Sequence, residues 1–465
     1  MPPLMADTIV ALATPPGEGG IGIVRLSGPE ALLYVAAIFT PSRLPSFAHA
    51  QSRRFYYGWV AEPGSKQPVD EVLVVWMQRP TTYTGEDIVE IQGHGGLVPL
   101  QQILRLCLEQ GARLAQPGEF TQRAFLHGRL DLTQAEAVMD LIQARSSAQS
   151  RQALEQLQGA LGQHVLRQSQ KVLQLLAQLE AWIDFSDEVG ELDTLSLQES
   201  LQLLCQELQQ LLATEQQGKV LRQGLNVALM GLPNVGKSSL LNALLGEERA
   251  IVSEYAGTTR DMLEEQVIVA GIPLRLRDTA GLRSSADPLE QLGVARTQRA
   301  LDEAQLLLLV LDSSRPLHPE EVTLCQMASS RPMVVVLNKS DLPQQLDQEE
   351  LLALLPTGTP TVATAVRLAY EATGLEQLRL ALGKVLPAIQ EKGELPLLTR
   401  QRHVQGVRQA WEHLRQGLQT LHSGLPLDCL SVDLRAAWTA LAELTGEVSS
   451  ADIAEAIFRD FCIGK

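Results

Sequence analysis

The chain has 465 residues, of which 54 are acidic and 38 basic, so its formal net charge at pH 7 is −16. This length predicts about three domains, and the charge argues against general attraction to nucleic acid, so RNA contact would need a local basic patch. The five cysteines lack C-x-x-C spacing, which argues against a zinc site and favours free thiols in a reducing compartment. The longest apolar runs, such as 306–311, are too short to span a bilayer, so we expect a cytoplasmic protein with no membrane partner.

The first 130 residues predict a small α+β domain. Runs with strand character alternate with two helical segments: strands at 8–13, 20–26, 54–60, 71–77 and 87–91, and helices at 30–39 and 97–109. The glycine-rich GEGGIG at 17–22 is not a dinucleotide-binding fingerprint, because a predicted strand follows it and no helix does.

Long helices are predicted in two separate parts of the chain. In LDLTQAE, Thr133 followed by Glu136 is an N-cap signature, so a helix is expected to begin there. Apolar residues at helical spacing continue through 146–218 and return at 399–423 and 430–445. The simplest arrangement is one helical domain interrupted by an inserted module; a coiled coil is the alternative, although no heptad pattern is sustained. The expected domains are 1–130, 131–222, 223–384 and 385–465, of which the second and fourth form the helical domain.

The inserted module opens with a complete phosphate-binding loop. Residues 231–238 read GLPNVGKS, a match to G-x-x-x-x-G-K-[ST], between a predicted strand at 225–230 and a helical run at 239–245. In this motif backbone N–H groups surround the phosphates, Lys237 reaches the same oxygens, and the Ser238 hydroxyl completes the shell of a Mg²⁺ ion. The chain is therefore predicted to bind a nucleoside triphosphate.

Three further elements follow in the order that is typical of guanine-nucleotide switch proteins. They are GTTRD at 257–261, DTAG after the strand at 272–277, and NKSD after the strand at 333–337. Thr259 in the first element offers its hydroxyl and carbonyl to Mg²⁺ and the γ-phosphate.

The NKSD element predicts which nucleotide base the chain binds. The Asp341 carboxylate can accept from N1–H and the exocyclic amine of guanine, and its unpaired burial would penalise adenine. Thr364 and Ala365, after the strand at 361–363, are the best candidate for the element that backs the base, with threonine where serine is common. Guanine is the predicted base, and the predicted GTP contacts are Asn234, Val235, Gly236, Lys237, Ser238, Ser239, Ser253, Glu254, Tyr255, Ala256, Gly257, Thr258, Thr259, Asp278, Thr279, Ala280, Gly281, Asn338, Lys339, Ser340 and Asp341.

Hydrolysis must differ from that of Ras. Ras-like proteins orient the attacking water with a glutamine directly after D-x-x-G, but here that residue is Leu282. Asn234, together with Ser253, Tyr255 and Thr258, can present an amide, carbonyls and hydroxyls to a monovalent cation beside the β–γ bridge, where it would neutralise developing charge. The alternative is that Asn234 only caps and fixes the loop.

Segments along essentially the whole chain resemble those of the tRNA modification GTPase MnmE (TrmE) family. They are DTIVALATPPGEGGIGIVRLSG, GEDIVEIQGHGG, PGEFTQRAFLHGRLDLTQAEAV, the nucleotide motifs and the final FCIGK. The resemblance implies an N-terminal folate-binding and dimerising α+β domain, a discontinuous helical domain and an inserted Ras-like P-loop GTPase domain with a doubly wound sheet. It also implies a homodimer that works with an FAD-dependent partner of the MnmG (GidA) type. Together they would place an aminomethyl or carboxymethylaminomethyl group at C5 of the wobble uridine of certain tRNAs, with a carbon from 5-formyl- or 5,10-methylene-tetrahydrofolate.

Position by position, the resemblance also assigns site residues. It implies K⁺ at Asn234, Ser253, Tyr255 and Thr258, Mg²⁺ at Ser238 and Thr259, and a general base for GTP hydrolysis at Glu290. Ser253 replaces a threonine that is common in the family and keeps the hydroxyl.

The implied folate contacts are Arg25, Glu90, Arg129 and Lys465. Arg129 departs from the lysine usual in the family, so a planar fork replaces a point charge. Without the resemblance, the first three residues would be interpreted as ion pairs at the surface or at strand ends. Cys462 has two interpretations, a thiolate in one-carbon chemistry or a small buried residue at the end of an amphipathic helix.

Two classes of function remain open. The first is an enzyme whose GTP cycle drives tRNA modification, and the second is a regulatory or ribosome-assembly GTPase of the Era-like class. The folate-like N-terminal segment and the terminal CIGK favour the first class, because an assembly GTPase needs neither of them.

Overall fold

In the computed structural model the chain divides into two compact units. One unit comprises Met1–Ile142, Glu155–Leu204 and Gln409–Lys465, and the other comprises Gln143–Leu154 and Cys205–Arg408. The residues that the structure describes are 7–64, 67–185, 193–246, 266–269, 271–278, 304–329, 331–368, 371–385, 395–423, 425–448, 456–459, 461 and 464.

The first unit begins with a seven-stranded sheet of order β3-β4-β5-β6-β2-β1-β7. Neighbouring strands are antiparallel except β1 and β7, and the strands are β1 (Ile9–Leu12), β2 (Gly22–Ser27), β3 (Phe39–Pro41), β4 (Phe55–Ala61), β5 (Pro68–Met77), β6 (Ile88–Gly93) and β7 (Arg113–Leu114). Helices α1 (Ala31–Ile38) and α2 (Leu97–Glu109) belong to the same core as alternate strand residues such as Val24, Val74 and Ile91, so they cover one face of the sheet. The predicted α+β domain is confirmed, and β2 follows the glycine-rich segment as expected.

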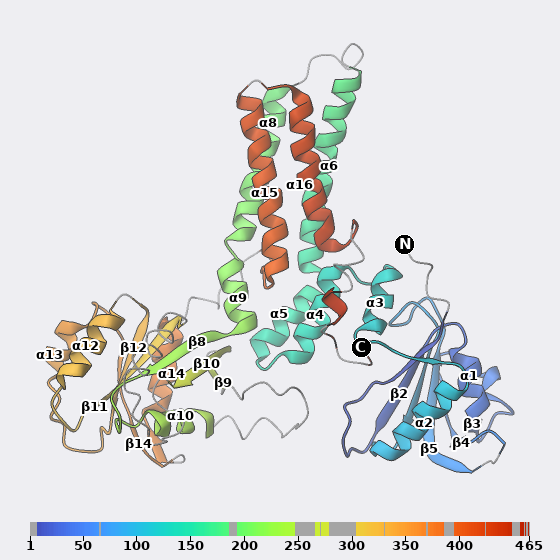
Figure 1. Ribbon diagram of the computed structural model, residues 1–465, viewed down its shortest axis with the longest axis horizontal. Coiled ribbons are helices and arrows are strands. Elements are labelled where there is room, and N and C mark those ends of the chain that lie inside the picture. The colour runs from blue at the N-terminus through green and yellow to red at the C-terminus, as the bar shows by residue number, and fades with distance from the viewer. Residues whose placement is uncertain are drawn as a thin grey trace, which may run out of the picture. The chain divides into compact units, whose positions relative to one another are not determined.

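The rest of the first unit is helical. Helix α6 (Ala160–Asp184) packs along α16 (Leu427–Thr445), although the two segments are far apart in the sequence (Figure 1). Arg435 of α16 forms an ion pair with Glu180 of α6. The helices predicted on both sides of the nucleotide motifs are present. Helix α3 (Glu119–Leu126) and almost all of α4 (Leu132–Gln143) belong to the first unit and α9 (Glu215–Gln223) to the second, while α5 (Ser147–Leu157), α8 (Thr194–Leu212) and α15 (Gln401–His422) have residues in both.

The predicted N-cap of α4 is wrong by two residues, because the cap is Asp131 and not Thr133. The N–H of Gln134 donates to Oδ1 of Asp131 over 2.9 Å, and the N–H of Asp131 donates to the Gln134 amide oxygen over 3.0 Å. This is a reciprocal capping box built on Asp131 rather than on Thr133. The Thr133 hydroxyl instead donates to the same Asp131 carboxylate, and Glu136 lies buried within the helix.

The second unit holds a six-stranded sheet of order β13-β12-β11-β8-β10-β9. All neighbouring pairs are parallel except β9 with β10. The strands are β8 (Leu225–Met230), β9 (Gln266–Val269), β10 (Ile272–Asp278), β11 (Leu306–Asp312), β12 (Met333–Asn338) and β13 (Thr361–Ala363), with a separate pair of strands β14 (Ala365–Leu368) and β15 (Glu371–Thr373).

Two hydrophobic cores cover the two faces of this sheet. Helices α10 (Lys237–Gly246) and α14 (Leu375–Val385) contribute to one core, and α12 (Pro319–Ala328) and α13 (Gln348–Leu354) to the other. Because both faces are covered, strands such as β11 are apolar along their whole length until the final aspartate. The predicted doubly wound sheet is confirmed. Within the described residues, no helix combines the length and the hydrophobicity that crossing a membrane requires.

Candidate functional site

The phosphate loop, Asp278 and the NKSD element lie at the carboxyl ends of strands β8, β10 and β12, whereas GTTRD at 257–261 lies outside the described residues. Strands β8, β10, β11, β12 and β13 run in the same direction, and in register Asp278 pairs with Leu229 and Asp312 with Asn338. The carboxyl ends of parallel strands in open α/β sheets are where such sheets bind ligands. These strand ends are therefore the candidate nucleotide site.

The phosphate loop joins β8 to α10, and its backbone requires glycine at two positions. Gly231 has φ +144° and Gly236 has φ +98°, and a Cβ on Gly236 would lie 2.1 Å from Nδ2 of Asn338. The Lys237 ammonium donates to the carbonyls of Gly231 and Leu232, each over 2.8 Å. The buried Lys237 ammonium thus lies inside a loop that has no Cβ at Gly231 and Gly236, which fits phosphate binding.

Asn234 lies at the exposed tip of this loop. Its backbone has φ +66°, the left-handed region, which asparagine tolerates better than most residues. Within the described residues its side chain makes no hydrogen bond, so its amide does not brace the loop there. The backbone conformation supplies a further structural reason for asparagine at this position.

The NKSD loop is joined to the phosphate loop through a buried side chain. Asn338 donates from Nδ2 to the carbonyl of Val235 over 2.8 Å, and its Oδ1 accepts from the Thr364 hydroxyl over 3.2 Å. The N–H of Ser340 donates to the carbonyl of Thr364 over 3.0 Å. The structure therefore brings Thr364, the candidate for the element behind the base, against this loop, while Asp341 is exposed at the end of the loop.

Two residues that the sequence analysis missed hold the loop from the other side. Oδ2 of Asp312 lies 2.6 Å from Nζ of Lys339, and the backbone N–H and hydroxyl of Ser313 both donate to the carbonyl of Asn338. Burial alone would raise the pKa of Asp312, but hydrogen bonds from Lys339 and Ser314 outweigh it and hold that pKa below its usual range. The sequence feature that could have indicated Asp312 is an acidic residue at the end of an otherwise apolar strand. That strand neighbours the strands that carry the motifs.

Several predicted site residues cannot be placed. Asp278 ends β10, as expected for the D-x-x-G element. The predicted site residues that lie outside the described residues are Ser253, Glu254, Tyr255, Ala256, Gly257, Thr258, Thr259, Thr279, Ala280, Gly281, Glu290, Cys462 and Lys465.

In the N-terminal sheet, Arg25 of β2 and Glu90 of β6 face each other in register. Nε of Arg25 donates to Oε1 of Glu90 over 2.9 Å, and Nη2 lies 2.8 Å from the same oxygen. The guanidinium also lies 5.8 Å from the ring centroid of Phe120, and Nη1 donates to the carbonyl of Gly464 over 3.4 Å. Arg25 of β2 therefore contacts β6, α3 and Gly464, the residue before Lys465. A cross-strand ion pair alone does not identify a ligand.

Arg129 lies over the ring of Tyr83, with 4.8 Å between the guanidinium carbon and the ring centroid. It also donates to the Tyr83 carbonyl over 2.7 Å. Tyr83 and Phe120 belong to one apolar cluster with Ile9, Ala11 and Ala115. Arg25, which pairs with Glu90, and Arg129 therefore each lie against an aromatic ring of the same cluster.

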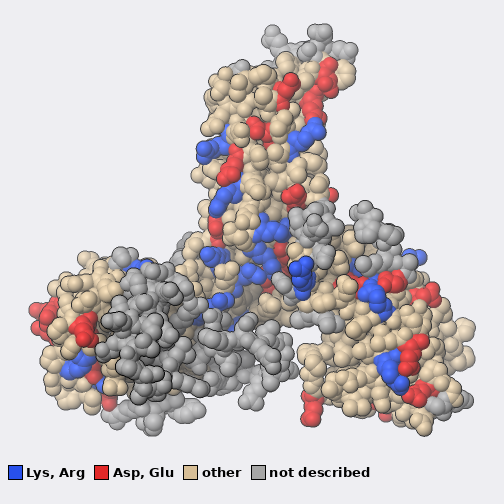
Figure 2. Space-filling model, in the orientation of Figure 1, with Lys and Arg blue, Asp and Glu red and all other residues tan. Residues whose placement is uncertain are grey.

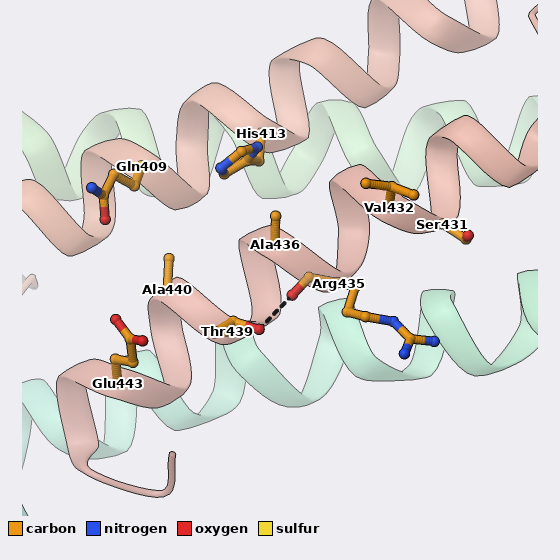
Figure 3. Close-up of a pocket in the computed structure, with 9 residues that line it drawn as sticks. All are labelled: Gln409, His413, Ser431, Val432, Arg435, Ala436, Thr439, Ala440 and Glu443. Carbon is orange, nitrogen blue, oxygen red and sulfur yellow. Dashed lines mark hydrogen bonds between the residues drawn. The ribbon is translucent and has the colours of Figure 1, made fainter. Parts of the chain in front are cut away.

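A groove of about 770 Å³ lies elsewhere in the first unit, between α15 and α16 (Figure 3). Gln409 of α15 faces Glu443 of α16, whereas the Arg435 side chain points away from α15 (Figure 3) and pairs with Glu180 of α6. The Thr439 hydroxyl donates to the Arg435 carbonyl. None of the predicted site residues that the structure describes lines this groove. The groove is therefore not the candidate nucleotide or folate site.

A doubly wound sheet with a phosphate loop after β8 and an NKSD loop bonded to it defines a P-loop guanine-nucleotide-binding protein. The family model for the GTP-binding protein TrmE N-terminus matches residues 8–129, and that for the MnmE helical domain matches residues 132–462. The chain belongs to the tRNA modification GTPase MnmE family.

Relatives named tRNA modification GTPase MnmE match over their full length. That of Ligilactobacillus salivarius (strain UCC118) is 44% identical over 468 residues, with 100% of this chain and 99% of the relative covered. That of Synechococcus sp. (strain JA-3-3Ab) is 45% identical over 463 residues, with 99% of each covered. The solved G domain of the T. maritima FeoB iron transporter is 26% identical and covers 35% of this chain and 99% of its own, but a TM-score of 0.26 is too low to carry an argument. The full-length matches favour the tRNA-modifying class over an Era-like assembly GTPase.

Proposed function

We propose that this chain hydrolyses GTP in the modification of tRNA, at C5 of the wobble uridine, together with an FAD-dependent partner of the MnmG type. A tetrahydrofolate derivative supplies the carbon. The observation that carries the proposal is the Asn338 bridge from the NKSD loop to the phosphate loop, in a chain whose whole length matches the family. The open backbone at Gly231 and Gly236, the Lys237 ammonium and the Asp341 carboxylate suit the phosphates and the guanine base of GTP.

Reconstitution tests this function. The purified chain is combined with the FAD-dependent partner, unmodified tRNA, a reduced folate and GTP, and the tRNA nucleosides are analysed by mass spectrometry. A C5-substituted wobble uridine should form with GTP and not with ATP. Formation of the same product with ATP, or without this chain, would contradict the proposal.

Contact with tRNA requires a local basic patch, because the chain as a whole is acidic. Figure 2 shows Lys and Arg side chains gathered toward the lower end of the helical bundle. The sequence at the beginning of α15 is basic, with Arg400, Arg402 and Arg408, of which Arg408 pairs with Glu215. This concentration of positive charge supports tRNA as the substrate.

A reduced folate is proposed to bind near the apolar cluster in the N-terminal domain, in contact with Arg25, Glu90, Arg129 and Lys465. The support is that the guanidinium groups of Arg25 and Arg129 lie against aromatic rings of this cluster, and that Arg25 also donates to the carbonyl of Gly464. A pterin ring offers paired donors to a carboxylate, and the anionic glutamate tail suits a guanidinium.

Arg25→Ala should weaken the binding of 5-formyltetrahydrofolate by about 10- to 150-fold, because a charge-assisted contact of about 1.5–3 kcal/mol is lost. Isothermal titration calorimetry measures the change. Arg105→Ala is the matched control, since it removes an arginine of α2 that also pairs with carboxylates, Glu62 and Glu109, in the same domain. No binding by the wild type, or equal binding by wild type and Arg25→Ala, would refute the site.

A homodimer is proposed to form through the sheet face that α1 and α2 leave open. On β4 the side chains of Phe55, Tyr57 and Trp59 are 55%, 49% and 44% exposed, and Leu73 of β5, the register partner of Tyr57, is 43% exposed. A contiguous exposed apolar surface of this kind is typical of a protein interface.

Trp59→Glu should shift the protein from dimer to monomer in sedimentation velocity, because a charge would be buried in an apolar interface. Leu33→Glu is the control: Leu33 is 57% exposed on α1, on the other face of the sheet. A dimer that survives Trp59→Glu unchanged, or is lost equally in the control, would rule out this interface.

The remaining assignments are also proposals. K⁺ is held by Asn234, Ser253, Tyr255 and Thr258, Mg²⁺ by Ser238 and Thr259, Glu290 is the general base, and Cys462 is the candidate thiolate in one-carbon chemistry. The exposed amide of Asn234 supports the first of these. Domain boundaries near 130, 222 and 384 and a cytoplasmic location are proposed as well, the latter because Cys107, Cys205, Cys325 and Cys429 are free thiols.

A further inference from the structure

Asp312 is a buried carboxylate at the end of β11 whose two oxygens have separate partners. Oδ2 lies 2.6 Å from Nζ of Lys339, and Oδ1 accepts from the Ser314 N–H over 3.0 Å and from the Ser314 hydroxyl over 2.6 Å. The side chain of Asp312 is 8% exposed and that of Lys339 is 33% exposed, so solvent screens this ion pair less than a fully exposed one. The carboxylate is therefore fixed on one side and directed at Lys339 on the other.

Lys339 is a residue whose conformation needs such support. Its backbone has φ +60°, a left-handed conformation that is unfavourable for a side chain of this kind, and such conformations persist where the surroundings fix them. It lies between Asn338, which bonds to the phosphate loop, and Asp341, the predicted reader of the base. Its long methylene chain offers an apolar surface next to those groups.

The segment that begins with Asp312 fixes two consecutive residues of the NKSD loop. Asp312 holds the ammonium of Lys339, and Ser313 donates its N–H and hydroxyl to the carbonyl of Asn338 over 3.0 and 2.8 Å. Asp312 and Asn338 are register partners on β11 and β12, so these contacts are short-range and direct. The conformation of the loop thus depends on the end of a neighbouring strand that carries no nucleotide motif.

We propose that Asp312 is a positioning residue for guanine-nucleotide binding, which acts by holding Lys339 in the conformation in which the NKSD loop receives the base. The proposal rests on the guanine-nucleotide site of the proposed function. Asp312 affects nucleotide affinity only through its ion pair with Lys339.

Asp312→Asn removes the charge and keeps the size and the acceptor for Ser314. The dissociation constant of fluorescent mant-GDP should rise about 10-fold, as expected for loss of a charge-assisted contact. The KM for GTP should rise with it while kcat stays unchanged. Glu321→Gln is the matched control: Glu321 is a buried carboxylate 2.7 Å from Arg315 in the same unit, with no contact to the NKSD loop. The control should lower the melting temperature without changing mant-GDP affinity.

A double-mutant cycle separates positioning from general stability. In a Lys339→Ala background, adding Asp312→Asn should leave the mant-GDP dissociation constant unchanged, because the group through which Asp312 acts is gone. A further loss of affinity in that background, or wild-type affinity in Asp312→Asn alone, would overturn the proposal. A wild-type chain that binds no guanine nucleotide would instead refute the proposed function.

Discussion

Glu290→Ala should lower the rate of GTP hydrolysis by at least about 100-fold and leave GTP affinity near that of the wild type, because a general base contributes about 10²–10⁴-fold to such a reaction. Glu290 follows the D-x-x-G element in a stretch rich in Ser, Ala, Asp and Pro. We expect this carboxylate to orient the attacking water, which would link the chemistry to a conformational step of the GTP cycle. Single-turnover hydrolysis and mant-GDP titration measure the two quantities separately.

The competing explanation for Glu290 is a glutamate that only stabilises a helix N-terminus, worth about 0.3–1 kcal/mol. Glu320→Ala provides the control, because Glu320 is an exposed glutamate in the first turn of α12. The control should hydrolyse GTP at the wild-type rate. Hydrolysis by Glu290→Ala within about threefold of wild type would favour the helix explanation, since loss of a general base costs at least about 100-fold.

GTP hydrolysis by the wild type should be more than about 10-fold faster in KCl than in NaCl at equal ionic strength, because fixed positive charge at the transition state commonly contributes about 100-fold or more. The reason is that Leu282 replaces the water-orienting glutamine and that the Asn234 amide is exposed and makes no hydrogen bond within the described residues. Asn234→Ala should erase the difference between the salts. Initial rates of phosphate release provide the measurement.

The left-handed backbone at Asn234 calls for a second variant. Alanine at φ +66° introduces strain, whereas glycine adopts that conformation freely and also lacks the amide. Asn234→Gly should therefore lose the preference for K⁺ as fully as Asn234→Ala. A K⁺ preference that survives in Asn234→Gly, or equal wild-type rates in the two salts, would return Asn234 to a purely structural role in the loop.

The parts of the fold that the sequence predicted well are those set by local chemistry. The strands β8 and β13 have the predicted bounds, because buried parallel strands are continuous apolar runs that end at polar loops. The phosphate loop was predictable since the conformation at Gly231 and Gly236 permits almost no other residue. The start of α4 was misplaced because Asp131 and Gln134 satisfy the same capping pattern as Thr133 and Glu136, and only the hydrogen bonds distinguish the two.

The parts that the sequence did not predict depend on contacts between strands. Asp312 has no motif around it, and its role appears only when β11 and β12 are paired in register. Arg25 and Glu90 were linked to folate only by the family resemblance, whereas the structure shows a cross-strand ion pair beside Phe120. A single-sequence pattern carries no information on which strands become neighbours, so such pairs could not be derived from it.

The claim that both the guanine-nucleotide site and the N-terminal site serve tRNA modification is tested most directly by the nucleosides of cellular tRNA. A bacterial strain that lacks its own MnmE-family protein is supplied with the wild-type chain, Glu290→Ala or Arg25→Ala at equal protein levels, and the wobble uridine is analysed by mass spectrometry. The wild type should restore the C5-substituted nucleoside, and neither variant should. Full restoration by either variant, or an unmodified wobble uridine with the wild type, would contradict the account.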